Sequence, residues 1–147
     1  MTLPDPDRRE VWRAFLTAHA ALEKMLAHAL EEEEDLQLPW FEILDALATS
    51  DEGSLRFNEL AERTMANPSS LSRQLDRLEE RRFVAREKSI LDDGRAIVVV
   101  LTPQGHETWK SASLTYYRIV RRSFTNTLTE TDVTALHRVF TKVLETG

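Results

Sequence analysis

Polar and apolar residues alternate along this chain mainly with the period of an α-helix. Asp5-Pro6 predicts a helix start, because aspartate caps a helix and proline suits its first position. The stripe that follows recurs every three or four residues up to the acidic run at 31–35, and it consists of Val11, Trp12, Phe15, Leu16, His19, Leu22, Met25, Leu26 and Leu30. Pro39 opens a second predicted helix, which ends before the turn at 51–53.

The centre of the chain predicts two short helices with a tight connection between them. Residues 54–57 read as a short extended piece, and Asn58 is expected to cap a helix over 59–64. Asn67-Pro68 predicts the start of the next helix, which runs to about Arg82. Two short helices joined by a few residues are typical of a helix-turn-helix.

A β-hairpin and two further helices are predicted after the helix-turn-helix. Residues 83–90 and 95–101 are strand-like, and 91–94 read as the hairpin loop between them. Thr102-Pro103 starts a long helix, and residues 129–132 resemble a capping box that opens the last one. We therefore expect a mainly α protein with a small β-hairpin wing: a winged helix-turn-helix with about six helices.

The predicted organisation is one compact domain in three parts. We expect an N-terminal helix over 1–37, a winged helix-turn-helix lobe over 38–102 and C-terminal helices over 103–147. A small lobe has little left to cover the apolar stripe of the last helix, which consists of Val133, Leu136, Phe140, Val143 and Leu144. We expect this stripe to be buried against a second copy of the chain in a homodimer. The alternative is that it packs only within the core of its own chain.

The net charge of −6 argues against DNA binding only when the chain is taken as a whole. Residues 54–102 carry nine Lys or Arg and eight Asp or Glu, a net of +1, so the remainder carries −7. The acidity therefore lies outside the predicted DNA-binding segment. Phosphate binding depends on the local field and not on the total charge.

The predicted helix after Asn67 has the two faces that a recognition helix needs. Leu71, Leu75 and Leu78 share one face and anchor the helix to the core. The opposite face and its flanks carry short or charged polar residues: Ser69, Ser70, Ser72, Arg73, Asp76 and Arg77. Short hydroxyl side chains let a helix enter the major groove, where an arginine can grip guanine. An ordinary surface helix is the alternative, but it would avoid like-charge pairs such as Arg73–Arg77.

The hairpin tip supplies a second predicted DNA contact. Arg95 can enter the narrow minor groove, and Asp93 is expected to orient Arg95 or to pair with Arg86. The alternative is a plain turn that needs only Gly94. Together, the helix and the wing give the predicted DNA-binding residues Asn67, Ser69, Ser70, Ser72, Arg73, Gln74, Arg77, Arg86, Lys88, Asp93 and Arg95.

Several local motifs together resemble the multiple-antibiotic-resistance-regulator (MarR) family. The motifs are L-A-E-R at 60–63, S-S-L-S-R-Q-L-D-R-L-E at 69–79, D-G-R at 93–95 and L-T-P-Q-G at 101–105, and the resemblance covers nearly the whole chain. One departure is visible, because the family usually has glycine where this chain has Arg82. Glycine there supplies a left-handed helix cap, so the arginine puts the local turn geometry in question.

The resemblance implies a homodimer whose terminal helices form the interface and whose two winged lobes read a palindrome. It also implies that a small aromatic or phenolic ligand releases the DNA. Aromatic walls plus a histidine suit such a ligand, and the candidates are Trp12, Phe15, His19, Trp40, Phe41, Trp109 and Tyr116. The alternative for each of these residues is packing in the core or at the dimer interface.

Other function classes find little support in the sequence. It has no cysteine, its four histidines lack ligand spacing, and it has no nucleophile elbow or phosphate loop, so we expect no metal, no cofactor and no enzyme. A winged helix used only for protein contacts would lack the small polar residues and the wing arginine. No secretory signal or membrane span is visible, which favours the cytoplasm.

The sequence therefore predicts a sequence-specific regulator of transcription that binds double-stranded DNA. Repression is the default, because a dimer that covers a promoter blocks polymerase without further contacts.

Overall fold

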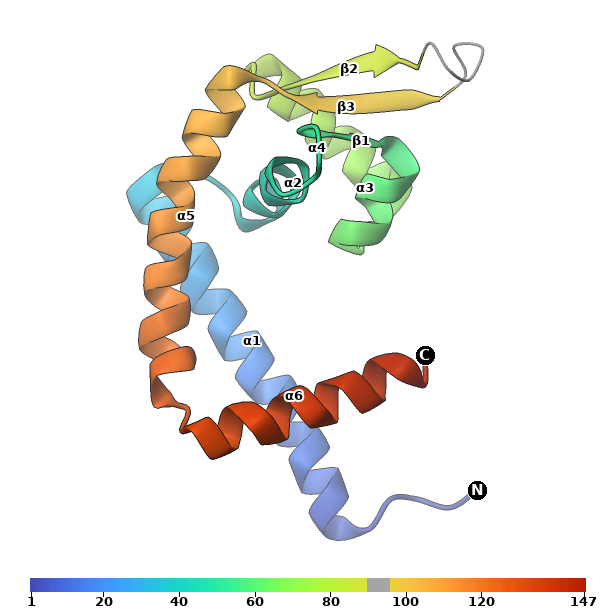
Figure 1. The fold of residues 1–147 in the computed structure, drawn as a ribbon, viewed down its shortest axis with the longest axis vertical. Helices are drawn as coiled ribbons and strands as arrows, with labels where there is room; N and C mark the ends of the chain where they lie inside the picture. Colours follow the sequence, from blue (N-terminus) through green and yellow to red (C-terminus); the bar gives the residue numbers. More distant parts are fainter. Residues whose placement is uncertain (90–95) are drawn as a thin grey trace. The chain divides into compact units, whose positions relative to one another are not determined.

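The computed structural model describes residues 1–89 and 96–147 and has the predicted mainly helical architecture (Figure 1). Its elements are, in chain order, α1 (Pro6–Glu34), α2 (Leu38–Ala48), β1 (Ser54–Arg56), α3 (Phe57–Thr64), α4 (Pro68–Glu80), β2 (Val84–Lys88), β3 (Ile97–Leu101), α5 (Pro103–Ser123), a 3-10 turn (Thr125–Thr127) and α6 (Glu130–Glu145). The chain divides into two compact units, one of residues 27–115 and one that joins residues 1–26 to 116–147.

Side-chain caps confirm most of the predicted helix starts. Asp5 accepts the backbone N–H three residues ahead at 3.0 Å. Asn67 accepts the backbone N–H groups of Ser69 and Ser70 at 2.9 and 3.4 Å. Thr129 and Asp132 form the predicted capping box, although aspartate stands where glutamate is usual. These helices begin where a local side chain satisfies otherwise unpaired N–H groups.

The predicted start of the third helix is wrong. The helix begins at Phe57 with Arg56 as its N-cap, so Asn58 lies inside the first turn. The reason is tertiary, because β1 pairs with β3 as far as Arg56 and leaves no room for a separate capping residue. The helix ends at Thr64, and its C-cap residue Met65 has a left-handed φ of 54°.

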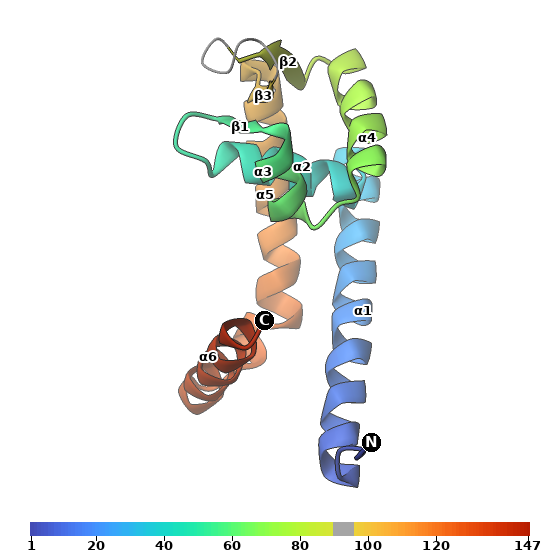
Figure 2. The same ribbon diagram turned by 90° about the vertical axis from the view of Figure 1, so that its right-hand side faces the viewer.

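The β-structure is a three-stranded antiparallel sheet with the order β1-β3-β2 (Figure 2). The predicted hairpin supplies β2 and β3, in which Arg86 lies opposite Val99. The extended piece before α3 becomes β1, and its Leu55 also pairs with Val99. The predicted hairpin loop at 91–94, with Asp93, and the wing arginine Arg95 lie outside the described residues.

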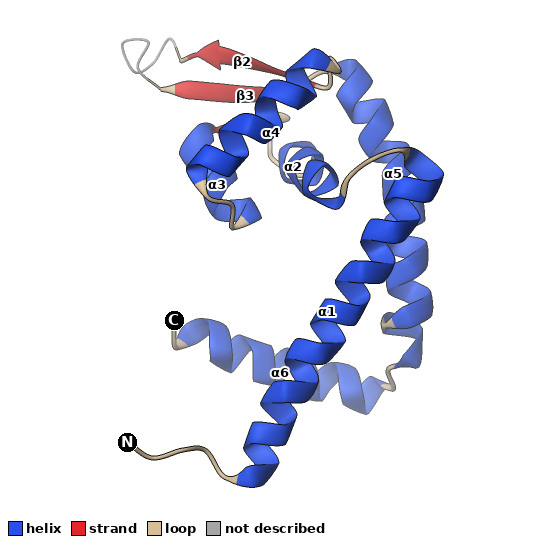
Figure 3. Ribbon diagram, turned by 180° about the vertical axis from the view of Figure 1, so that it is seen from behind, coloured by secondary structure: helices blue, strands red, loops and turns tan. Residues whose placement is uncertain are grey.

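The core of the 27–115 unit surrounds α2. Figure 3 shows this helix nearly end-on, with α3, α4 and the sheet around it. Its Leu44 and Leu47 are fully buried. Glu34, at the end of α1, accepts hydrogen bonds from Ser111 and Thr115 of α5 at 2.9 and 2.8 Å.

The other unit, residues 1–26 and 116–147, leaves large apolar side chains exposed. Trp12 is 60% exposed, Val133 51% and Val143 61%. The structure describes α6 throughout, and this helix contains no buried residue. Across residues 1–89 and 96–147, no helix has both the length and the hydropathy that crossing a membrane requires.

Candidate nucleic-acid interface

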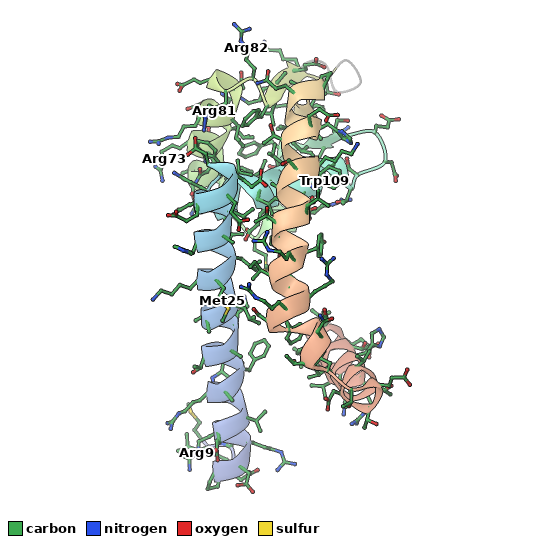
Figure 4. The ribbon with its side chains drawn as sticks, turned by 90° about the vertical axis from the view of Figure 1, so that its left-hand side faces the viewer. Arg9, Met25, Arg73, Arg81, Arg82 and Trp109 are labelled. Atoms are coloured by element: carbon green, nitrogen blue, oxygen red, sulfur yellow. The ribbon has the colours of Figure 1, made fainter. Side chains whose placement is uncertain are left out.

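Helix α4 has the two faces predicted for a recognition helix. Leu71, Leu75 and Leu78 are fully buried and fix the helix to the unit's core. Arg73 and Arg77 are exposed on the other side, and Figure 4 shows Arg73 extending away from the ribbon. Ser69 is also exposed, whereas Ser70 and Ser72 are half-buried. The helix therefore presents small hydroxyls and two guanidinium groups to solvent.

Among the predicted DNA-binding residues of α4 and its N-cap, Asn67 and Gln74 have structural partners. The side-chain oxygen of Asn67 caps α4. The Gln74 Oε1 atom accepts a hydrogen bond of 2.6 Å from the Trp40 indole N–H. The cap orients the first turn of α4, and the Trp40 contact ties its middle to α2.

The chain leaves α4 through a left-handed turn at Arg82, whose φ is 64°. The Arg82 N–H donates to the Glu79 carbonyl and the Phe83 N–H to the Leu78 carbonyl, both at 2.9 Å. This pair of bonds is the Schellman motif, which usually has glycine at the left-handed position. The departure at Arg82 therefore leaves the turn geometry intact.

Sequence reasoning missed the role of Arg81, the residue before this turn. Its guanidinium lies 5.5 Å from the centroid of the Trp40 ring and 5.8 Å from that of Phe83. Its Nη2 atom also lies 3.6 Å from a carboxylate oxygen of Asp35. An arginine over aromatic rings contributes packing as well as charge. Arg81 therefore helps to hold the end of α4 against α2.

Arg86 of β2 contacts α4 directly. Its Nε atom donates to Glu79 and its Nη2 atom to Asp76. The hydrogen bond to Asp76 and the nearby charge of Glu79 raise the pKa of Arg86, although partial burial opposes the shift. Lys88, two residues further along the strand, is exposed. The predicted partner Asp93 lies outside the described residues.

The L-T-P-Q-G segment forms a tight junction between the wing and α5. The Thr102 hydroxyl donates to the Arg82 carbonyl at 2.7 Å and accepts the Gly105 N–H at 3.0 Å. A Cβ atom on Gly105 would stand 2.0 Å from the Phe83 carbonyl oxygen. Glycine at 105 is therefore required by the close approach of two backbones.

Three predicted ligand-binding aromatics belong to the 27–115 unit and have packing roles there. Trp40 and Phe41 are 8% and 1% exposed. The half-buried Trp109 donates its indole N–H to Asp45 at 2.9 Å. These contacts favour the packing interpretation for this group.

The other four candidates belong to the second unit. Trp12, Phe15 and His19 line an apolar groove together with α6 residues such as Phe140, whose ring centroid is 6.0 Å from that of Phe15. Tyr116 lies edge-on to Tyr117 with ring centroids 5.1 Å apart. Of the seven aromatic and histidine candidates, three therefore belong to one unit and four to the other, and three of these four line the groove.

Comparisons with known proteins place this geometry in a family. A sequence model of the MarR family matches residues 34–96. A search of curated proteins returned no significant match.

Solved structures extend the match to the whole chain. AbsC, a MarR family transcriptional regulator from Streptomyces coelicolor, is 30% identical with a TM-score of 0.90, and the match covers 99% of this chain and 97% of AbsC. Sco3205, a MarR family transcriptional regulator from the same organism solved in complex with DNA, is 27% identical with a TM-score of 0.91 over 99% and 90%.

A more distant match supports the fold alone. A mutant form of MarR from E. coli, solved with operator DNA, is 22% identical with a TM-score of 0.79 over 96% and 99% of the two chains. The full-length similarity to AbsC and the match over the helix-turn-helix segment lead to one conclusion. This chain belongs to the MarR family of DNA-binding transcriptional regulators, which are not enzymes.

Proposed function

We propose that this protein binds a pseudo-palindromic operator in double-stranded DNA as a homodimer and thereby represses transcription. The observation that carries the proposal is the exposed face of α4, where Ser69, Arg73 and Arg77 stand opposite a fully buried leucine row. The DNA complex of Sco3205 supports the same use of the fold.

Arg73 and Arg77 are the proposed base readers in the major groove. Each guanidinium can make a bidentate contact to guanine O6 and N7. The serines near the start of α4 are short enough to let the helix approach and can bind phosphate. Lys88 of β2 is a proposed phosphate contact, and Arg95 remains a predicted minor-groove contact outside the described residues.

The apolar groove of the second unit supports the homodimer. Its lining is almost purely apolar, and it includes exposed residues of both α1 and α6. An exposed patch of this kind on a folded chain marks an interaction surface. We therefore propose residues 1–26 and 116–147 as the dimerisation part, which shifts the boundaries predicted from the sequence.

Release by a small aromatic ligand is a further element of the proposal. Trp12, Phe15 and His19 give the groove aromatic walls and an imidazole that can hydrogen-bond a phenolic ligand. The test is a gel-shift titration with phenolic compounds and cellular extracts. If none of them lowers operator affinity, this element is wrong while DNA binding stands.

The central experiment selects DNA sequences bound by the purified protein from a random pool. We expect a two-fold symmetric consensus with half-sites about one helical turn apart, near 34–36 Å. Binding should weaken steeply with salt, because phosphate contacts release counterions. Recovery of no consensus, or a salt-independent affinity, would contradict the proposal.

Replacement of Arg73 tests base reading. Arg73→Ala should relax base preference at one position of each half-site by roughly 1–3 kcal/mol, because it removes a bidentate contact. Competition binding against DNA with single base changes measures this effect. Arg121→Ala, an exposed arginine of the other unit, is the control and should leave base preference unchanged. A uniform loss across all sequences would make Arg73 a phosphate contact instead.

A further inference from the structure

Two of the three carboxylates of the proposed recognition helix, those of Asp76 and Glu79, lie beside the wing strand and should oppose DNA binding. Asp76 and Glu79 are three residues apart in α4, and their side chains are 58% and 36% exposed. Any approach of this helix to the phosphate backbone brings these like charges together, which is unfavourable. A helix that reads DNA therefore needs a nearby positive group that offsets the negative charge of these carboxylates.

Arg86, on the neighbouring strand β2, offsets part of this negative charge. One edge of its guanidinium faces both carboxylates, with Nε on Glu79 and Nη2 on Asp76. The Arg86 side chain is only 27% exposed, so it is the most covered of the three. Charge-assisted bonds of this kind are stronger and more directional than neutral ones. The guanidinium is always charged, and the pairing raises the pKa of Arg86 further.

Two features of the fold bring Arg86 to this position. The left-handed turn at Arg82 reverses the chain so that β2 contacts α4. Pairing of β2 with β3 then fixes the backbone of Arg86 opposite Val99. Val84, two residues earlier and hence on the same face of the strand, is 3% exposed. Arg86 thus lies on the inward face of β2, the face that contacts α4.

We propose that Arg86 is a positioning residue for DNA reading, which ties α4 to the wing strand and offsets part of the negative charge of Asp76 and Glu79. This inference rests on the proposed DNA-binding function. It revises the sequence-based prediction of Arg86 as a direct DNA contact. The consequence is that the effect of losing Arg86 depends on whether the two carboxylates are present.

The test is a double-mutant cycle read out as affinity for the selected operator. In the wild-type background, Arg86→Gln should lower affinity on the order of tenfold, because it leaves two carboxylates uncompensated beside the DNA. In the Asp76→Asn, Glu79→Gln background the same change should lower affinity by no more than about twofold. The ratio of specific to random-DNA affinity should also fall for Arg86→Gln in the wild-type background.

A direct phosphate contact gives a different result. Arg86→Gln would then lower affinity by the same factor in both backgrounds and reduce the salt slope by about 1, with an unchanged ratio of specific to random-DNA affinity. That outcome would overturn the inference. Circular dichroism checks folding, and if Arg86→Gln alone does not fold, the comparison within the Asp76→Asn, Glu79→Gln background decides between the two results.

Lys88→Gln is the matched control, because it removes one positive charge from the same face of β2. Its effect should be equal in the two backgrounds. If Lys88→Gln shows the same dependence on Asp76 and Glu79 as Arg86→Gln does, the coupling is general electrostatics and the inference is wrong. If the wild-type protein selects no DNA at all, the proposed function itself fails, which is a distinct result.

Discussion

Arg82 adopts a backbone conformation that glycine would adopt at lower free energy. Its φ of 64° places Cβ close to neighbouring backbone atoms, which costs about 1 kcal/mol for a residue other than glycine. Its side chain is exposed and extends away from the ribbon (Figure 4). The Schellman hydrogen bonds hold the turn in spite of this cost. The position is therefore one where the native residue is not the most stable choice.

Arg82→Gly should raise the free energy of unfolding by about 0.5 kcal/mol, which corresponds to a rise in Tm of about 1–2 °C. The reason is relief of the left-handed strain, partly offset by the greater freedom of glycine in the unfolded chain. Thermal unfolding followed by circular dichroism measures it. Arg82→Ala is the control, since alanine keeps Cβ and should give no gain. An equal gain for alanine would trace the effect to the arginine side chain.

At the scale of elements, the junction between β2 and α5 depends on one close contact. The Phe83 carbonyl accepts the Thr102 N–H at 3.1 Å, and Gly105 passes directly against it. A side chain at 105 would also meet Leu101 Cδ1 at 2.8 Å. This contact sets how the first turn of α5 meets the end of the wing.

Gly105→Ala should therefore destabilise the protein by roughly 1–3 kcal/mol, because backbone atoms must move to admit the methyl group. Chemical denaturation measures the free energy of unfolding. Gln104→Ala, at an exposed neighbour in the same turn, should change it by less than about 0.5 kcal/mol. A Gly105→Ala variant as stable as the wild type would show that the junction can relax at little cost.

The elements that the sequence predicts well are those that local chemistry defines. Asn67 and Thr129 cap their helices through side chains within three residues, so the caps are visible in the sequence. Asn58 has the same chemistry but lies inside a helix, because the pairing of β1 with β3 determines where α3 begins. That pairing joins residues more than 40 positions apart, and a strand of three residues carries too weak a periodic signal.

The candidate site shows the same division. The periodicity of α4 separates Arg73 and Arg77 from the buried leucines without any tertiary information. The partners of Gln74 and Arg86 lie 34 residues away in Trp40 and up to ten residues away in Asp76 and Glu79. Sequence spacing alone does not reveal such pairs. The sequence therefore predicted which charged side chains of α4 are exposed, but it did not predict which charged or polar side chains have partners within the fold.

At the scale of the whole molecule, the protein has a net charge of −6, although its proposed partner, DNA, is also negatively charged. The segment 54–102 nevertheless has a net charge of +1, and within it Arg86 is paired with two acidic residues of α4. The acidic residues outside this segment repel DNA at low salt and oppose non-specific contact between DNA and the rest of the protein. The distribution of charge thus favours binding through one surface only.

The second feature at this scale is the apolar groove, which a single chain leaves open. Phe140 of α6 is 38% exposed and lies within this groove beside Phe15. We expect Phe140→Glu to weaken the homodimer, because it places a charge in a surface that association would desolvate. Sedimentation velocity measures the dimer, and operator affinity should fall with it, since two half-sites are bound by two chains.

Thr141→Glu separates this effect from added negative charge. Thr141 is exposed on α6 and does not line the groove, so the same charge there should leave the dimer intact. If Phe140→Glu remains dimeric, the groove is not the dimer interface, and a ligand becomes its favoured occupant. If it becomes monomeric but keeps full operator affinity, one winged lobe suffices for DNA binding. The two measurements together therefore test the dimer and its use in DNA reading separately.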